Sequence, residues 1–193
     1  MRFTDYLTEQ INTNVMVVDI QPSYEKFIHF KIWEFCNFLN NQRKILYLYN
    51  GESLGMDTKD ELIMFLLENE LKESKLKSIQ FIDKGYAFLR SWMDSDIDEE
   101  IIIKALQYMD KRNVNDSRDI ETDEWIEIIP ELEDYSHIIG DDPIYFPDIE
   151  ISELKRWNNS YICGGGKTEC LKEMEILLEA FKIKTKRIDK FVY

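Results

Sequence analysis

Short apolar runs alternate along the chain with longer segments whose apolar residues recur every three or four positions. The valine-rich run at 14–20 is apolar at successive positions, which is typical of a strand buried on both faces of a parallel sheet. Comparable runs occupy 44–49, 77–82 and 160–163. We therefore expect these four segments to be neighbouring, mainly parallel strands.

Helical periodicity fills the intervals between these strands. The segments expected to be helical are 24–41, 58–71, 96–112, 151–159 and 169–182, and a last strand is expected at 184–193. Thr58 followed by Glu61 forms a capping box, a helix-start pattern. Strands that alternate with helices predict a three-layer α/β/α fold with a mostly parallel sheet, Rossmann-like in architecture. At 193 residues the chain is expected to be a single α/β domain, 1–193.

Composition and charge narrow the range of cellular locations and partners that we expect. Hydrophobic residues make up 44% of the chain, but no apolar run is long enough to cross a bilayer. The N-terminal sequence lacks the apolar core of a signal peptide, so we expect a cytoplasmic protein. Three cysteines do not indicate a disulfide framework. The net charge of −14 argues against broad binding to nucleic-acid backbones, and leaves open a small-molecule substrate, homo-oligomers or a basic protein partner.

Polar residues stand where the predicted strands end. Asp19 ends the first strand, Asn50 follows the second, and Asp83 with Lys84 ends the third. The glycine-rich segment 164–170 follows the fourth. Ligands of open parallel sheets bind at the carboxyl ends of the strands, so we expect these residues to converge.

The glycine-rich segment reads Cys-Gly-Gly-Gly-Lys-Thr-Glu-Cys and allows two interpretations. Gly166, Lys167 and Thr168 match the end of a phosphate-binding loop, but its first glycine would fall at Tyr161. The other interpretation is that Cys170 begins a helix, where free N–H groups and the helix dipole favour a thiolate and could hold an oxyanion. Alternatively, Cys170 is a small apolar residue that packs the helix on the sheet.

Three short motifs resemble the isochorismatase-like cysteine hydrolases. Asp19-Ile20-Gln21 is similar to the family's first strand end, Asp-x-Gln, and 163–171 is similar in register to its nucleophile loop. Lys84, followed by Ala87-Phe88, is similar to the family's lysine motif. The interval from lysine to cysteine is longer than is usual in the family, which implies an insertion at about 91–149. We expect this insertion to form helix and loop beside the mouth of the site and to cover it.

The resemblance implies a nucleophilic mechanism on a small substrate with an amide-like or other C–N bond. Cys170 would attack the carbon, Asp19 would accept the thiol proton, and Lys84 would keep Asp19 ionised and stabilise the thiolate. Cys170 would then react with iodoacetamide faster than Cys36. Gly164, Gly165, Gly166, Lys167 and Thr168 would form the oxyanion or ligand loop. Without the resemblance, Asp19 reads as a strand-end or capping residue and Lys84 as a surface lysine.

No cofactor and no metal are expected. The metal-binding subgroup of the family uses histidines after the second strand, where this chain has none. His29 falls in an aromatic predicted helix, where we expect a core or boundary residue, and His137 falls in an acidic loop.

Two other classes of function stay open, so the sequence does not decide whether the chain is an enzyme. A PIN-like nuclease would bind Mg²⁺ or Mn²⁺ through clustered carboxylates. Its candidate ligands are Asp19, Glu52 or Asp57, Asp116 or Asp119, and Glu169 or Glu173. The third class is a non-catalytic scaffold whose acidic insertion binds a protein.

Overall fold

The computed structural model describes residues 13–51, 57–85 and 87–193. Its strands are β1 (Asn14–Val18), β2 (Lys44–Tyr49), β3 (Ile79–Asp83), β4 (Ser160–Gly164) and β5 (Thr185–Arg187). All pairings between them are parallel, in the order β3-β2-β1-β4-β5. The predicted set of four neighbouring parallel strands is confirmed, and β1 lies at the centre.

Successive residues of β1 point into two separate hydrophobic cores. Val15 and Val17 belong to the core on one side of the sheet, whereas Met16 and Val18 belong to the core on the other. All four side chains are fully buried. This alternation explains the continuous apolar run, because both faces of a parallel sheet are covered.

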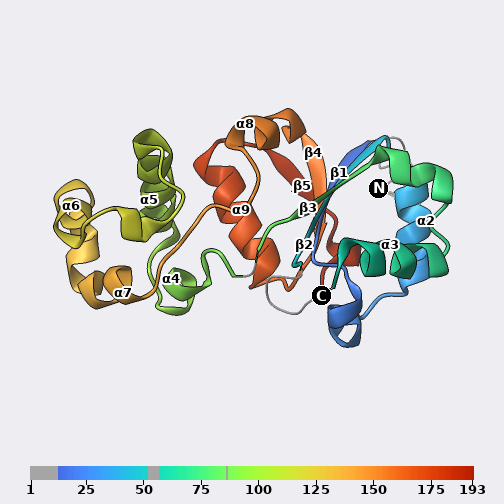
Figure 1. Ribbon diagram of the computed structural model, residues 1–193, viewed down its shortest axis with the longest axis horizontal. Coiled ribbons are helices and arrows are strands. Elements are labelled where there is room, and N and C mark those ends of the chain that lie inside the picture. Colours follow the sequence, from blue (N-terminus) through green and yellow to red (C-terminus); the bar gives the residue numbers. More distant parts are fainter. Residues whose placement is uncertain (1–12, 52–56, 86) are drawn as a thin grey trace, which may run out of the picture.

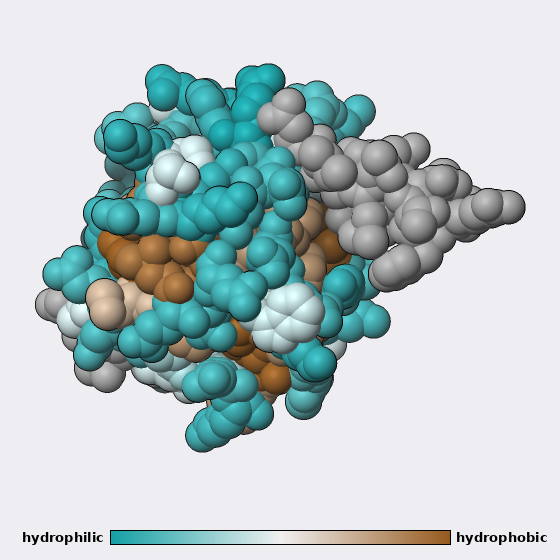
Figure 2. Space-filling view, turned by 90° about the vertical axis from the view of Figure 1, so that its right-hand side faces the viewer, coloured by the Kyte–Doolittle hydropathy of each residue, from teal (hydrophilic) through white to brown (hydrophobic). Residues whose placement is uncertain are grey.

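Helices cover the two faces of the sheet, which gives the predicted three-layer architecture (Figure 1). One face carries α2 (Ile32–Asn40) and α3 (Lys59–Glu68), and α3 begins with the predicted capping box at Thr58. The other face carries α9 (Cys170–Ala180). The outer surface on the side of α2 and α3 is mostly hydrophilic, with apolar side chains showing between polar ones (Figure 2).

The segment 91–149 forms a further helical layer outside α9 (Figure 1). Its helices are α4 (Arg90–Asp94), α5 (Glu99–Arg112), α6 (Thr122–Ile128) and α7 (Ser136–Asp141). Helix α5 packs on α9, and Gln107 donates a hydrogen bond from Nε2 to the carbonyl of Ala180 at 2.8 Å. The rings of Trp92 and Trp125 meet edge to face at 6.0 Å and are fully buried. The segment is therefore a packed layer whose buried side chains continue the hydrophobic core between the sheet and α9.

Shorter elements complete the described chain. They are α8 (Ile151–Leu154) and the 3₁₀ turns η1 (Pro22–Phe27), η3 (Glu73–Ser78), η4 (Ser117–Asp119), η5 (Pro130–Tyr135), η6 (Lys155–Trp157) and η7 (Asp189–Phe191). The expectation of one continuous helix at 24–41 is wrong. The chain forms η1, leaves it in extended conformation at Ile28, and begins α2 only at Ile32. The expected last strand is also shorter, because η7 replaces its second half. None of the helices in the described ranges is both long and apolar enough to span a membrane.

Candidate functional site

The site lies at the carboxyl edge of the sheet, where three neighbouring strands end one residue before a polar side chain. Asp19 follows β1, Asn50 follows β2 and Lys84 follows β3. The main chain holds this register beyond the strands, since the Asp19 N–H donates to the Leu48 carbonyl and the Lys84 N–H to the Tyr49 carbonyl, both at 2.9 Å. The predicted convergence at this edge is thus present.

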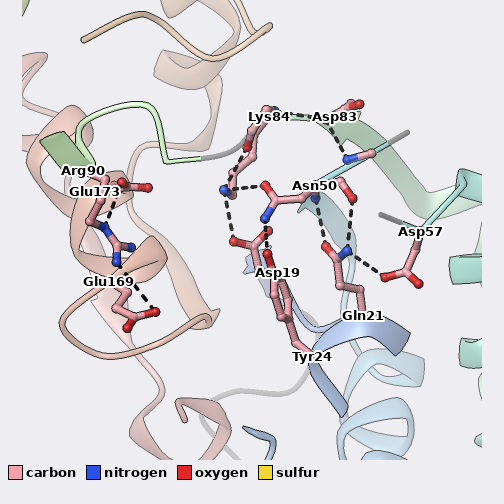
Figure 3. A network of polar contacts seen from close by, with 12 residues as sticks. Asp19, Gln21, Tyr24, Asn50, Asp57, Asp83, Lys84, Arg90, Glu169 and Glu173 are labelled. Carbon is pink, nitrogen blue, oxygen red and sulfur yellow. Dashed lines mark hydrogen bonds and ion pairs between the residues drawn. The ribbon is translucent and has the colours of Figure 1, made fainter. Parts of the chain in front are cut away.

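Asp19 and Lys84 form a fully buried ion pair. Lys84 Nζ lies 3.0 Å from Asp19 Oδ2, and neither side chain is exposed to solvent. Lys84 also donates to Asn50 Oδ1 at 2.9 Å and to the Gly85 carbonyl at 3.2 Å, so that it reaches between Asp19 and Asn50 (Figure 3). The interpretation of Lys84 as a surface lysine is wrong.

A network of amide and tyrosine side chains fixes Asn50. Gln21 pairs with the main chain of Asn50 in both directions, accepting from its N–H at 2.9 Å and donating to its carbonyl at 3.0 Å. The same Gln21 amide donates to Asp57 Oδ2 at 2.8 Å, and Asn50 Nδ2 donates to the Tyr24 hydroxyl at 2.7 Å (Figure 3). The side-chain amide of Asn50 therefore presents its oxygen, not its nitrogen, to Lys84.

The Asp83 carboxylate links the loop after β2 to the loop after β3. Its Oδ1 accepts from the N–H groups of Gly51 and Gly85, each at 3.0 Å. A Cβ atom on Gly51 would lie 1.9 Å from Asp83 Oδ2, so this approach requires glycine. The carboxylate thereby holds the ends of β2 and β3 in fixed relation.

The glycine-rich loop after β4 brings Cys170 to the same place. Gly164 and Gly165 have φ values of +87° and +63°, and a Cβ on Gly164 would lie 2.1 Å from the Val18 carbonyl oxygen. This tight turn lets α9 start directly beside the end of β1. The thiol of Cys170 lies near the Asp19 carboxylate and the Lys84 ammonium, and the pKa of the thiol responds to both groups.

The contacts of the Asp19 carboxylate are chiefly electrostatic. Within the described ranges, neither of its oxygens accepts a well-aligned hydrogen bond. Its main chain is also unusual, with φ of +50°, a left-handed conformation that aspartate tolerates better than most residues. A buried carboxylate on a left-handed backbone, paired with a buried lysine, is more typical of a functional site than of a helix cap.

Burial raises the pKa of Asp19, while the Lys84 cation and the Cys170 thiol oppose that rise. For Lys84, burial acts to lower the pKa, but Asp19, Cys170 and Glu173 together outweigh it, and the pKa lies above its ordinary value. The lysine consequently stays protonated at neutral pH. An aspartate with a raised pKa is a stronger base than an ordinary aspartate and is suited to accept a proton.

The expectation of a resting thiolate at Cys170 is wrong. Burial raises the pKa of its thiol above the ordinary value, and the Asp19 carboxylate adds to the rise, whereas Lys84 only partly opposes it. Cys170 is therefore a neutral thiol at rest and needs a base to remove its proton. Burial also raises the pKa of Cys36, to about 12. Since Cys36 is fully buried and Cys170 is 7% exposed, access still favours alkylation of Cys170.

Some backbone N–H groups around Cys170 already donate hydrogen bonds within the protein, and others stay available to a ligand. The N–H groups of Lys167, Glu169 and Leu171 donate to backbone carbonyls, that of Lys167 to Tyr193 at 2.9 Å. No described side chain caps the start of α9. The first turn of this helix thus keeps donors that an oxyanion could engage.

A cavity of about 450 Å³ opens onto Cys170. It is lined by Tyr24, Phe27, His29, Arg90, Gly166, Lys167, Thr168, Glu169, Cys170 and Tyr193. Tyr193 forms a wall and is fixed there, because its hydroxyl donates to the Asp19 carbonyl at 2.6 Å and its N–H to the Gly165 carbonyl at 3.2 Å. A cavity of this size accommodates a small molecule.

Two expectations about the surroundings of the site need correction. His29 is an exposed lining residue of the cavity and not a core residue, because the chain is extended between η1 and α2. No residue of 91–149 is among the described residues that line this cavity, so the expected cover is not seen there. The start of that segment, 93–99, instead lines an adjacent hollow shared with Lys167 and Thr168.

Arg90 and Glu173 complete the site and were not expected as a pair. Arg90 Nε lies 3.5 Å from Glu173 Oε1, and Nη1 lies 3.8 Å from Glu169 Oε2 (Figure 3). Glu173 is fully buried. Burial raises its pKa, against the effects of Lys84 and Arg90. Glu173 stands three residues after Cys170, so helical spacing could have placed it on the same face of α9.

The carboxylates considered as metal ligands are dispersed. Asp57 accepts from Gln21, and Asp116 pairs with Arg118 at 2.6 Å. Asp119 is exposed, and Glu52 lies outside the described residues. In the ranges that the structure describes, no group of three or more His, Cys, Asp or Glu side chains could hold a metal ion.

Comparisons with protein-family models, with curated proteins and with solved structures found no match to this chain.

Proposed function

We propose that this protein is a cysteine hydrolase that cleaves an amide-like or other C–N bond in a small substrate, in the manner of the isochorismatase-like hydrolases that its motifs resemble. One observation carries the proposal. Asp19, Lys84 and Cys170 come from three distant segments, and they meet at the carboxyl edge of the sheet beside a cavity. Nucleophile, base and orienting cation are the parts that such chemistry needs.

In the first half of the reaction, Cys170 Sγ attacks the carbonyl carbon while the thiol proton moves to Asp19. The oxyanion that forms is held by N–H groups at the start of α9. The C–N bond then breaks, the amine leaves with the proton from Asp19, and a thioester remains on Cys170. The neutral resting thiol fits this sequence, because Asp19 removes the proton as the S–C bond forms.

In the second half, a water molecule attacks the thioester carbon and gives a proton to Asp19. The C–S bond breaks, the carboxylic acid product leaves, and the proton on Asp19 returns to the Cys170 thiolate. Lys84 keeps a positive charge beside Asp19 throughout, which favours its ionised form at the start of each half. The enzyme ends in its initial state.

The nuclease alternative has weaker support from the geometry. A divalent cation at Asp19 would stand next to the Lys84 ammonium, which already lies 3.0 Å from the carboxylate. The described carboxylates that could join Asp19 are paired with Arg90, and the others lie in separate contacts. The interpretation as a non-catalytic scaffold leaves the buried triad and its cavity without a role.

The test is hydrolysis of a panel of small primary amides and ureido compounds, with release of ammonia as the measurement. Cys170→Ser should abolish hydrolysis of any amide that the parent protein cleaves, and intact-mass spectrometry of the parent should show an acyl adduct on Cys170. Cys36→Ala is the matched control, because this cysteine lies on the buried face of α2, away from the cavity, and its loss should not affect turnover. Hydrolysis that survives Cys170→Ser, or a nuclease activity that depends on Mg²⁺ or Mn²⁺, would contradict the proposal.

A further inference from the structure

Arg90 is held between buried and exposed carboxylates without using its full hydrogen-bonding capacity. Its separations from Glu173 and Glu169, 3.5 and 3.8 Å, are longer than a good hydrogen bond. Among the described side chains, Arg90 Nε and both Glu173 oxygens lack a hydrogen-bond partner although they are buried. A guanidinium has five N–H donors, so Arg90 keeps donors for another group.

Those donors belong to a residue that lines the cavity at Cys170. Lys167 lines it as well, while Glu169 is the one carboxylate among its described lining residues. The lining thus carries two cations against one carboxylate, while Glu173 pairs with Arg90 and is not among the described lining residues. Cations are the minority among the charged residues of this chain, whose net charge is −14.

Much of the remaining lining is aromatic. Tyr24 and Tyr193 are half-buried, and Phe27 is 49% exposed. Aromatic rings beside a guanidinium suit a planar apolar group that carries an anion at one end. Cys170 faces the same space.

We propose that the substrate carries a carboxylate, that Arg90 binds this carboxylate in the cavity, and that Glu173 positions Arg90 from behind. The planar guanidinium matches a carboxylate with two parallel hydrogen bonds. A carboxylate brings a single negative charge into this region, whereas a dianionic phosphate would bring two negative charges near Asp19 and Glu173. The inference rests on the proposed function only in placing the scissile C–N bond at Cys170.

The first test measures binding to Cys170→Ser, which removes turnover from the experiment. Isothermal titration calorimetry compares benzoate, its neutral analogue benzamide, and phenyl phosphate. Benzoate should bind at least about tenfold more tightly than benzamide, as expected for a charge-assisted pair. Equal binding of the two, no binding of benzoate, or tighter binding of phenyl phosphate would each overturn the assignment.

The second test identifies the residue responsible. Arg90→Gln in the same background should abolish the preference for benzoate, and Arg90→Lys should restore part of it, because the charge returns without the planar fork. Arg90→Gln leaves Glu173 buried without its cation, so Arg90→Gln/Glu173→Gln is the charge-balanced variant and should lose the preference equally. A preference that persists in either glutamine variant would overturn the role of Arg90.

Arg112→Gln is the matched control, because this arginine pairs with Glu124 in the outer helical layer and lies outside the cavity. Its benzoate affinity should equal that of the Cys170→Ser background. The two proposals can fail independently of each other. If no amide is hydrolysed, a preference for benzoate still supports the anion site at Arg90. If benzoate is not preferred, hydrolysis of neutral amides still supports the roles proposed for Asp19, Lys84 and Cys170.

Discussion

At the scale of single residues, the site is a group of charged side chains that are buried side by side. Asp19, Lys84 and Glu173 are fully buried, and Arg90 approaches Glu173 from the cavity side. When Asp19 and Glu173 are ionised and Cys170 keeps its proton, two anions and two cations balance. In the proposed mechanism, proton transfer from Cys170 to Asp19 leaves the total charge unchanged, which limits the electrostatic cost of that step in a low-dielectric interior.

Removal of Lys84 should be costly for stability. In Lys84→Met the Asp19 carboxylate stays buried without a cation, and breaking a buried pair in this way costs about 3–5 kcal/mol. Urea unfolding at pH 7 measures the loss. Lys84→Met/Asp19→Asn should recover much of it, since no unpaired charge remains.

The control for that variant is Lys104→Met, which breaks an exposed pair with Glu131. Exposed ion pairs contribute little, so its midpoint should stay close to that of the parent. If Lys84→Met unfolds at the same urea concentration as Lys104→Met, the buried pair does not stabilise the fold as described.

Glu173 should make stability depend on pH. Burial raises its pKa above the ordinary value of 4.5 in the folded state. A group with a raised folded-state pKa stabilises the fold below its unfolded pKa, and that contribution is lost as pH rises through the folded pKa. Relative to Glu173→Gln, the parent protein should therefore lose stability as pH rises above about 4.5 towards neutrality.

Urea unfolding of both proteins across that pH range measures this difference. Glu179→Gln is the matched control, because Glu179 belongs to the same helix but is exposed. A constant difference in free energy of unfolding between the parent and Glu173→Gln at every pH would contradict the assignment.

At the scale of elements, the strand ends and the turn after β4 decide where the chemistry lies. Parallel strands all deliver their next residue to one edge, and β1, β2 and β3 there supply Asp19, Asn50 and Lys84. The turn at Gly164 and Gly165 folds the chain back so that α9 starts beside β1. Short loops at the edge of a rigid sheet thus hold Asp19, Lys84 and Cys170 in place.

The glycine turn provides a prediction with a control in the same chain. Gly164→Ala should strongly destabilise the protein and displace Cys170, because the residue has φ of +87° and the new Cβ would lie 2.1 Å from the Val18 carbonyl oxygen. Gly140→Ala should instead stabilise it by about 0.5–1 kcal/mol, as expected for glycine in a helix. Gly140 is exposed in α7, and its nearest neighbour would be 3.9 Å away.

Thermal unfolding, with alkylation of Cys170 as the local measurement, distinguishes the two variants. A Gly164→Ala protein with the parent's Tm and the parent's alkylation rate would contradict the view that this turn requires glycine.

Apolar periodicity and strand-end position predicted the sheet, the helix at α5 and the convergence of Asp19 with Lys84. They could not predict the break at 28–31, because the apolar spacing continues across it although the chain turns there. Arg90 and Tyr193 were also missed. Their places depend on how α4 and the segment after β5 pack against α9 and β1, and no local pattern encodes such packing. The ionisation state of Cys170 was mispredicted, because helix position alone ignores burial.

At the scale of the whole molecule, the acidic charge is carried outside a nearly neutral site. The chain has 38 Asp and Glu residues against 24 Lys and Arg. Repulsion among these surface charges opposes the compact state, and salt screens it over about 10 Å at 0.1 M. The Tm should therefore rise by a few degrees between low and physiological ionic strength.

Differential scanning calorimetry at two salt concentrations measures this effect. A variant with Asp123→Asn, Glu127→Gln and Glu133→Gln, all exposed in the outer helical layer, should show a higher Tm at low salt and a smaller salt response. An equal or larger salt response in this variant would show that surface repulsion is not the cause.

The central position of β1 has a consequence for the order of folding. Val15 pairs with Ile45 on one side and with Tyr161 on the other, so one neighbour is close in sequence and the other is remote. Pairings between remote segments form slowly, since a long loop must close before the contact is gained. A chain emerging from the ribosome can join β1, β2 and β3 early, and with them Asp19 and Lys84. Cys170 comes later, after the whole outer helical layer, so it meets Asp19 only after that layer has been made.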